Sequence, residues 1–436
     1  MPQLWLKLWH IWPARVWLQD YNRKHLQADL IAAVIVTMML IPQGLAYAML
    51  AGLPPVTGLY AIILPIIAYA LFGSSRTLAV GPVAVISLLS ANAVGIAQQQ
   101  TGLGIISLSM SLALMSGLIM LLMGVFRLGF IANLLSRPVI VGFISAAGIV
   151  IAAGQLKHIL GINTDGQNLL EISQATVANI GNAHWQTTTI GTLSVIFLYW
   201  SRKPLCNLLS RYFSPTIAHS ISKIAPVGAA VIGIVAVSNW QLDTLGVTVI
   251  GDIPAALPSL QWPHLTPKLV MILLPSALMI SLIGYVESIS VAQTLANKRR
   301  QQINPDHELL GLGAANLASA ISGGFAVTGG FSRSVVNFDA GAATPMAGVF
   351  TAVGMAIASL WLTPYLALLP KAVLGATILV AVLTLIEPQE FRFTWRYSRQ
   401  DFMAMMVTLA MVLLVSVEAG VMAGVAATIA LMLWRT

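Results

Sequence analysis

The segment Gly329-Gly330-Phe331-Ser332-Arg333-Ser334 places a cation, two hydroxyl groups and two glycines inside a strongly apolar part of the chain. Apolar segments precede and follow it, so Arg333 is expected at membrane depth, where an arginine costs about 3 kcal/mol on insertion scales. A bound anion would offset that cost. Glycine lets a ligand approach the backbone, and a helix N-terminus offers free N–H groups and a positive dipole end. The segment therefore predicts an anion site at the start of a short helix.

The composition is that of a membrane protein with several spans. The chain has 436 residues, of which 58% are hydrophobic and 8% are charged, whereas soluble domains carry about 25% charged residues. The net charge of +8 is expected to reflect Lys and Arg in cytoplasmic loops, so no nucleic-acid partner is expected. The single cysteine, Cys206, excludes an intrachain disulfide.

Catalysis is not expected from this sequence. All seven histidines lie in tails or in predicted loops. The predicted spans contain no pair of metal ligands and no nucleophile beside a base, which an enzyme site would need. We therefore expect no enzyme activity, no cofactor and no metal centre.

Hydropathy predicts an all-α polytopic membrane protein with about fourteen segments, several of them shorter than the roughly 20 residues of a full span. Pro42 and Gln43 are expected to interrupt the first span, and residues 156–186 and 240–268 are expected to form long loops. The predicted segments are 29–51, a second one ending near 72, 83–96, 104–124, 138–155, 187–201, 224–239, 269–294, 308–322, 332–341, 344–362, 371–386, 402–416 and 420–434.

Two pairs of short matches indicate an internal repeat. Ala79-Val80-Gly81-Pro82-Val83 resembles Ala326-Val327-Thr328-Gly329-Gly330, and Leu135-Ser136-Arg137-Pro138-Val139 resembles Leu368-Leu369-Pro370-Lys371-Ala372. Each pair lies third or fifth in its own set of seven segments. Short, Gly/Pro-interrupted segments at matching places are typical of inverted-repeat transporters. We expect a transmembrane domain over 26–436, with repeats at about 26–240 and 269–434 and short β-like pieces before half-helices three and ten.

The N-terminal residues 1–25 predict an amphipathic helix in the membrane interface. Trp5, Trp9 and Trp12 are spaced four and three apart, with basic residues at other positions, as in interfacial helices. A cytoplasmic N-terminus puts nearly all Lys and Arg residues on the cytoplasmic side, as the positive-inside rule requires. We therefore expect a multi-pass protein of the cell's inner (plasma) membrane with both termini in the cytoplasm.

Several motifs resemble those of the sulfate permease (SulP) family, which includes prestin. They are Ile41-Pro42-Gln43-Gly44-Leu45-Ala46-Tyr47-Ala48, Leu53-Pro54-Pro55-Val56-Thr57-Gly58-Leu59-Tyr60, Gly81-Pro82-Val83-Ala84-Val85, Ala292-Gln293-Thr294-Leu295-Ala296-Asn297-Lys298 and Phe331-Ser332-Arg333-Ser334. The resemblance implies seven-plus-seven inverted repeats, a core domain that moves against a gate domain, and an anion site between half-helices three and ten. Family members usually carry a cytoplasmic STAS domain. This chain stops at Thr436, so we expect either a truncated chain or a member without that domain.

The resemblance also implies which residues line the anion pocket. They are Gln43, Tyr47, Val83, Ala84, Phe331, Ser332 and Arg333. For Tyr47 and Phe331, plain helix packing is an equal alternative. For Arg333, the alternative is a structural partner, either an acidic residue or a backbone carbonyl.

Glu287 is the only acidic residue predicted well inside a span of the core domain. A carboxyl group withdrawn from water can carry a proton, and family members with an acid here resemble proton-coupled symporters. Together with the hydroxyls of Ser288 and Ser290 it would instead suit sodium. A third possibility is that Glu287 only pairs with Arg333.

The sequence as a whole predicts a secondary active anion transporter. We expect proton-coupled symport of sulfate or a similar small oxyanion by alternating access. Alternatives are a sodium-coupled bicarbonate transporter, a proton-coupled dicarboxylate transporter, and an anion exchanger or channel; Arg333 argues against a neutral nucleobase as substrate. The expected partners are a small inorganic or carboxylate anion, a proton or sodium ion, the lipid bilayer and a second copy in a homodimer.

Overall fold

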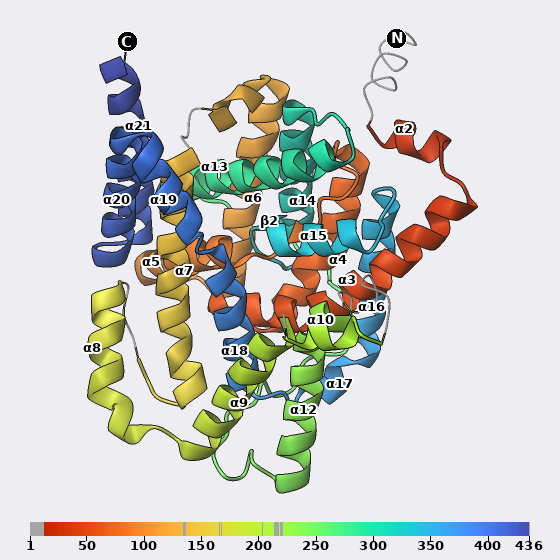
Figure 1. Cartoon of the computed structure of the whole chain (residues 1–436), viewed down its shortest axis with the longest axis vertical. Helices are drawn as coiled ribbons and strands as arrows, with labels where there is room; N and C mark the ends of the chain where they lie inside the picture. The colour runs from red at the N-terminus through yellow and green to blue at the C-terminus, as the bar shows by residue number, and fades with distance from the viewer. Residues whose placement is uncertain are drawn as a thin grey trace. The chain divides into compact units, whose positions relative to one another are not determined.

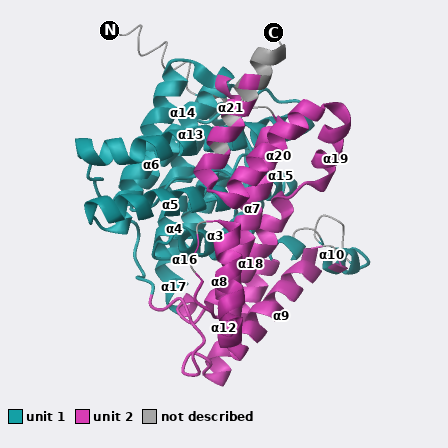
Figure 2. Ribbon diagram, turned by 90° about the vertical axis from the view of Figure 1, so that its left-hand side faces the viewer, with its two compact units in different colours: residues 1–130, 205–224, 253–364 teal, residues 131–204, 225–252, 365–436 magenta. Residues whose placement is uncertain are grey.

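The computed structural model describes residues 13–133, 137–164, 166, 168–202, 204–212, 218 and 221–435. Regular structure in these residues is almost entirely helical (Figure 1). The chain divides into two compact units that alternate along the sequence (Figure 2). Unit 1 comprises Met1–Phe130, Leu205–Ile224 and Ile253–Pro364, and unit 2 comprises Ile131–Pro204, Ala225–Asp252 and Tyr365–Thr436.

Unit 1 contains the predicted half-helices and the helices packed around them. Its elements are α2 (Pro13–Gln19), α3 (Arg23–Leu50), α4 (Val56–Phe72), β1 (Val80–Gly81), α5 (Ala84–Thr101), α6 (Ile105–Val125), α13 (Pro267–Lys298), α14 (Pro305–Ile321), β2 (Thr328–Gly329), α15 (Phe331–Asp339) and α16 (Met346–Trp361). Three short helices lie where the units join in sequence, η1 (Leu128–Asn133), α10 (Pro204–Leu209) and α17 (Thr363–Leu366). Of the predicted interfacial helix, residues 1–12 with Trp5, Trp9 and Trp12 lie outside the described residues, and Trp17 on α2 is buried.

Helix α3 corrects one expectation about the first span. It runs without a break through Pro42, which lies inside the helix. Proline removes one hydrogen bond and usually kinks a helix rather than ending it when the surrounding packing holds both halves. Here a second helix packs closely: a Cβ placed on Gly44 would lie 3.2 Å from the Gly58 carbonyl oxygen of α4. The glycines thus let α3 and α4 cross with their backbones in contact.

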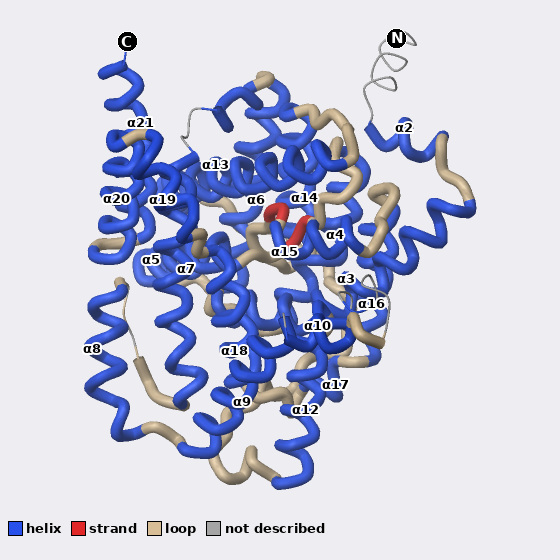
Figure 3. The backbone as a smooth tube through the Cα atoms, viewed as in Figure 1, coloured by secondary structure: helices blue, strands red, loops and turns tan. Residues whose placement is uncertain are grey.

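The two short strands bring distant parts of the chain together. β1 and β2 pair antiparallel, with Val80 opposite Gly329 and Gly81 opposite Thr328, and all four residues are buried (Figure 3). Each strand leads within three residues into a helix, α5 after β1 and α15 after β2. The β-like pieces predicted before both half-helices are therefore present, although α5 extends to Thr101, beyond the predicted end at 96.

Unit 2 contains the remaining helices. They are α7 (Arg137–Leu160), α8 (Leu169–Asn179), η2 (Ile180–Asn182), α9 (Trp185–Arg202), α12 (Ala225–Trp240), α18 (Lys371–Val382), η3 (Leu383–Leu385), α19 (Pro388–Tyr397), α20 (Arg399–Leu414) and α21 (Val417–Arg435). The expected loop 156–186 is wrong in part, because α7 continues to Leu160 and α8 lies within it. Helix α8 carries only two buried residues, and hydropathy did not predict it as a membrane span.

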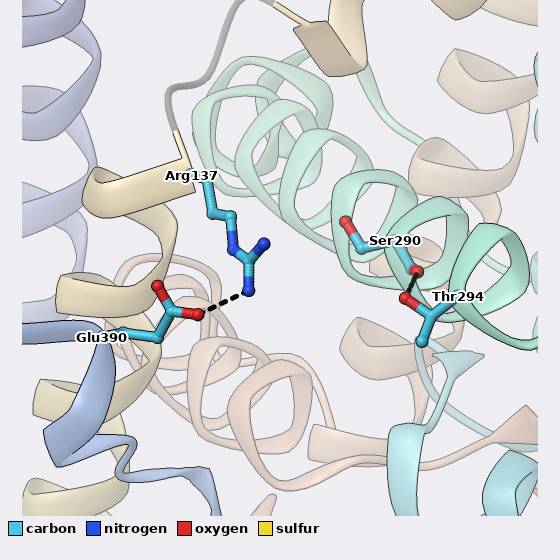
Figure 4. A network of polar contacts seen from close by, with 4 residues as sticks. All are labelled: Arg137, Ser290, Thr294 and Glu390. Atoms are coloured by element: carbon cyan, nitrogen blue, oxygen red, sulfur yellow. Dashed lines mark hydrogen bonds and ion pairs between the residues drawn. The ribbon is translucent and has the colours of Figure 1, made fainter. Parts of the chain in front are cut away.

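Polar contacts join several helices of unit 2. Arg137 on α7 and Glu390 on α19 form an ion pair of 2.6 Å (Figure 4). The Arg137 side chain is 76% exposed, so this pair contributes little stability. A guanidinium nitrogen of Arg202 donates to the carbonyl of Val380 on α18 at 2.5 Å.

Within the part of the chain that the structure describes, five helical segments are long and apolar enough to cross a membrane. They are Arg23–Leu50, Ile105–Val125, Arg137–Leu160, Pro267–Lys298 and Lys371–Tyr397, and the shorter apolar helices are Val56–Phe72, Ala225–Trp240 and Met346–Trp361. Neither α5 nor α15 is among them. The two helices that follow the strand pair are therefore set apart from the long spans by their composition or length.

Candidate functional site

The two half-helices, α5 and α15, begin without a capping side chain. Their N-cap residues are Val83 and Gly330, both with extended backbone, and neither offers an oxygen to the first-turn N–H groups. Among the other helices of unit 1, Asn22, Thr266 and Asn304 accept from the first turns of α3, α13 and α14, whereas α4, α6 and α16 also begin without a side-chain cap. The first-turn N–H groups of α5 and α15 thus have no acceptor from the N-cap side chain, and each helix start carries roughly half a positive charge.

Arg333 occupies the first turn of α15 and is 3% exposed. Its guanidinium donates from Nη1 to the Pro82 carbonyl at 2.5 Å and from Nη2 to the Thr328 carbonyl at 3.4 Å. The carbonyl partner that was the structural alternative for Arg333 is therefore present. The side chain joins the segment entering α5 to strand β2, so its charge lies close to both helix starts. Its Nε is buried without a hydrogen-bond partner.

The glycines around Arg333 make room for the guanidinium. A Cβ on Gly330 would lie 2.8 Å from Nη2 of Arg333, and one on Gly81 would lie 3.1 Å from Nη1. A side chain thus lies close to the backbone at both positions. The approaching group at these glycines is the chain's own arginine, whereas the sequence alone suggested a ligand.

Further polar side chains of α15 bind the segment that enters β1. Ser334 accepts from the Ala79 N–H at 2.9 Å, and Asn337 donates to the Thr77 carbonyl at 3.1 Å. Both side chains are buried. Hydrogen bonds to otherwise unpaired buried backbone groups are costly to remove, so these residues hold the two half-helices in one arrangement. The sequence analysis did not identify Asn337 as a site residue, although this polar residue lies one helical turn after Arg333.

Strand β2 and the residue before it are also held by side chains of α13 and α14. The Ser288 hydroxyl of α13 accepts from the Gly329 N–H at 2.8 Å and lies 2.6 Å from the Thr328 hydroxyl. On α14, the Asn316 amide both donates to the Val327 carbonyl at 2.8 Å and accepts from the Val327 N–H at 2.9 Å. The residues preceding α15 therefore have fixed partners on two helices.

Glu287 lies on α13, next to Ser288. One carboxylate oxygen, Oε2, is buried and has no hydrogen-bond partner. Glu287 and Arg333 interact electrostatically, yet the structure contains no ion pair between these two described residues. Glu287 and Arg333 therefore act on each other at a longer range than an ion pair. Ser290 donates to its own helix, to Val286 at 2.7 Å, and its carbonyl accepts from Thr294 at 2.7 Å (Figure 4).

The remaining predicted site residues differ in exposure. Gln43 and Tyr47 lie one turn apart on α3 and are buried, and Tyr47 interacts electrostatically with Arg333. Val83 and Ala84 are also buried, whereas Phe331 is 50% exposed and Ser332 is exposed. The start of α15 is thus the more accessible of the two helix starts.

Two further buried carboxylates of unit 1 were not anticipated, and both lie near the N-terminal ends of their helices. Glu308 on α14 is fully buried and accepts from the Tyr69 hydroxyl at 2.7 Å and from the Ser74 and Ser75 N–H groups at 2.9 Å. Asp29 on α3 is equally buried and caps the loop after α15. In each of these two residues, both carboxylate oxygens accept hydrogen bonds.

The residues described contain no cluster of three or more His, Cys, Asp or Glu side chains able to hold a metal ion. The bundle of long apolar helices is that of an all-α polytopic membrane protein. Its candidate anion site consists of two uncapped helix starts beside a buried arginine. The profile of the Sulfate permease family matches residues 26–408. The chain belongs to the sulfate permease family. Since this family consists of transporters, the expectation that the chain is not an enzyme is confirmed.

Known proteins similar to this chain include Sulfate transporter 4.1, chloroplastic, from Arabidopsis thaliana. It is 33% identical over 423 residues, which cover 96% of this chain and 60% of that protein. The chain thus spans about 60% of the length of the first curated relatives that it matches. Their names, and membership of the family, agree with a multi-pass membrane protein.

Solved structures share the fold. SLC26A9 superimposes with a TM-score of 0.89 at 24% identity, covering 100% of this chain and 69% of that chain. The transmembrane domain of the cyanobacterium bicarbonate transporter BicA gives a TM-score of 0.78 at 22% identity, covering 92% of this chain and 98% of that one. At these identities the likeness establishes the fold.

Proposed function

We propose that this chain is the membrane domain of a secondary active anion transporter that moves sulfate or a similar small oxyanion by alternating access. One observation carries the proposal: two uncapped helix starts are joined by a strand pair, and the Arg333 guanidinium is buried between them. Each helix start contributes about half a positive charge and Arg333 a whole one. An oxyanion with several acceptor oxygens matches such a site. Relatives named as sulfate transporters support the same substrate class.

In this proposal the first-turn N–H groups of α5 and α15 bind the anion, and Arg333 adds positive charge without contacting it. The guanidinium is occupied by two carbonyl groups, so its field rather than a direct bond attracts the anion. Phe331 and Ser332, at the exposed start of α15, form the wall from which the anion approaches. Gln43 and Tyr47 on α3 complete the pocket together with Val83 and Ala84 at the start of α5.

The architecture that goes with this function has about fourteen segments arranged as seven-plus-seven inverted repeats, over residues 26–240 and 269–434. Unit 1, which contains both half-helices, is proposed as the core domain and unit 2 as the gate domain. The protein would be multi-pass in the cell's inner (plasma) membrane, with both termini in the cytoplasm and residues 1–25 lying in the interface. A second copy is proposed as its partner in a homodimer.

Coupling to protons is proposed to run through Glu287. Its buried Oε2 has no partner, so a proton bound there displaces no existing hydrogen bond. The negative charge of Glu287 partly cancels the attraction of Arg333 for an anion, and protonation removes that cancellation. Proton and anion would therefore bind cooperatively, each raising the affinity of the other by the same factor. Sodium is the alternative coupling ion, because the Ser288 and Ser290 hydroxyls donate to their own helix and their oxygens keep lone pairs for a cation.

The test is sulfate uptake into proteoliposomes with and without an inward proton gradient, set beside a panel of other oxyanions. Arg333→Gln is expected to weaken sulfate binding by roughly 10- to 100-fold, the size of a lost charged interaction, while the purified protein stays monodisperse. Glu287→Gln is expected to exchange sulfate but not to concentrate it on the gradient. The exposed Glu171 on α8 gives the matched control, Glu171→Gln. Uphill uptake by Glu287→Gln would move proton coupling to another residue, and undiminished transport by Arg333→Gln would exclude the site.

A further inference from the structure

The loop that follows α15 is bound by two charged side chains of opposite sign. We call residues 338–344, from the last turn of α15 to the end of the loop, the exit loop. Ala342 and Thr344 in it are buried. Its backbone therefore needs internal partners for both its carbonyl and its N–H groups.

The cation is Arg299, the residue directly after α13. Its Nη1 donates to the Ala342 carbonyl at 2.5 Å and its Nη2 to the Phe338 carbonyl at 3.2 Å. The guanidinium carbon also lies 4.3 Å from the centre of the Phe338 ring. A cation that binds carbonyls at a helix C-terminus stabilises the negative end of the helix dipole.

The anion is Asp29 on α3. Its Oδ1 accepts from the Ala343 N–H at 2.7 Å and the Thr344 N–H at 3.0 Å, and its Oδ2 accepts from the Thr344 hydroxyl at 2.6 Å. Asp29 and Arg299 also interact electrostatically. One loop is thus held by a cation on its carbonyl groups and by an anion on its N–H groups.

Three elements that carry the proposed site meet at the exit loop. Helix α3 bears Gln43 and Tyr47, α13 bears Glu287, and α15 starts at the anion site. Helix α15 has only nine residues, about 14 Å of helix, so a shift at its end is carried to its start. We propose that Arg299 and Asp29 are positioning residues that fix α15 against α13 and α3 and thereby set the affinity for the anion. The inference rests on the proposed function, because the affinity concerned is that for the transported anion.

The experiment compares Arg299→Ala with Arg300→Ala. Arg300 is the next residue, is exposed and takes no part in holding the loop, so both variants lose one cation from the same helix end. The first measurement is the KM and maximal rate of sulfate uptake in proteoliposomes. The second is hydrogen exchange of the full-length protein over residues 331–344, with residues 84–101 of α5 as the internal reference.

Arg299→Ala is expected to raise the KM for sulfate roughly tenfold, since misplacing a binding group by about 1 Å can cost up to about 100-fold. It is also expected to speed exchange over 331–344, while Arg300→Ala changes neither quantity. Arg299→Lys keeps the charge and can bind one carbonyl, so its KM should lie between those of Arg299→Ala and the wild-type protein. Asp29→Asn keeps the side-chain shape and provides a second variant with the same expected direction of change.

Faster exchange in Arg299→Ala with an unchanged KM would overturn the proposal, because the residue would then only stabilise the loop. An equal KM increase in Arg300→Ala would also overturn it and assign the effect to surface charge. If wild-type vesicles take up no oxyanion, the proposed function fails. The exchange measurement still decides in that case whether Arg299 holds α15.

Discussion

Gly330→Ala tests whether the glycine at the start of α15 exists to accommodate Arg333. The backbone of Gly330 has φ −92° and ψ 131°, which alanine adopts without strain. Its added Cβ would lie 2.8 Å from Nη2, 3.0 Å from Nε and 3.1 Å from Cζ of Arg333. The guanidinium therefore has to move, although the side chain is buried and held by two carbonyl groups.

The size of the effect follows from those contacts. Overpacking a buried site costs typically about 1–3 kcal/mol, and the hydrogen bond that Arg333 donates to Pro82 is a charged one worth about 1.5–3 kcal/mol. Since about 1.4 kcal/mol is tenfold in affinity, we expect Gly330→Ala to weaken sulfate binding by roughly 10- to 100-fold. The control is Gly95→Ala on α5, where an added Cβ meets no atom within 4 Å.

The assay is sulfate binding to the purified protein, measured as a double-mutant cycle with Arg333→Gln. If Gly330 acts through Arg333, alanine at 330 adds little loss once the arginine is gone, and the two effects are strongly non-additive. Fully additive losses would refute this reasoning. They would mean that Gly330 serves direct approach of the anion to the backbone.

Two further substitutions test how the half-helices are held. Glu308→Ala leaves the Tyr69 hydroxyl and two buried N–H groups without an acceptor, at about 1–3 kcal/mol each; thermal unfolding in detergent should show a clear decrease in the midpoint, and an unchanged midpoint would contradict the assigned contacts. Ser288→Ala should lower stability by about 1–3 kcal/mol because the Gly329 N–H loses its buried acceptor, whereas Ser290→Ala, which loses only a bond to its own helix, should be near neutral in the same measurement. Equal effects of the two serine variants would contradict the role assigned to Ser288.

Much of the helical framework and the start of each half-helix could be predicted because they depend on local properties. Apolar length predicts spans, and the breaks at Gly81-Pro82 and Gly329-Gly330 predict where short helices begin. The contacts of Arg333 were only partly predictable. An intramembrane arginine calls for a partner, but nothing local in the sequence says that its partner is the Pro82 carbonyl, 251 positions away in the chain.

Glu308 and α8 show why the rest could not be predicted. The hydrogen bonds of Glu308 reach residues 234 positions away, and hydropathy near a predicted span end cannot tell a buried carboxylate from a solvated one. Helix α8 has only eleven residues and carries Glu171, Gln174 and Asn179 among its apolar ones, so hydropathy does not mark it as a span. At Pro42, the local rule predicts a break, but packing against α4 keeps the helix continuous.

The most direct test of the central claim is to locate a bound anion experimentally. Selenate has the shape and charge of sulfate and scatters anomalously, so a structure determined with selenate would show its position. We predict selenate within about 3 Å of first-turn N–H groups of α5 and α15, with no such density in Arg333→Gln. Selenate bound elsewhere, or no bound selenate at concentrations that saturate transport, would contradict the account.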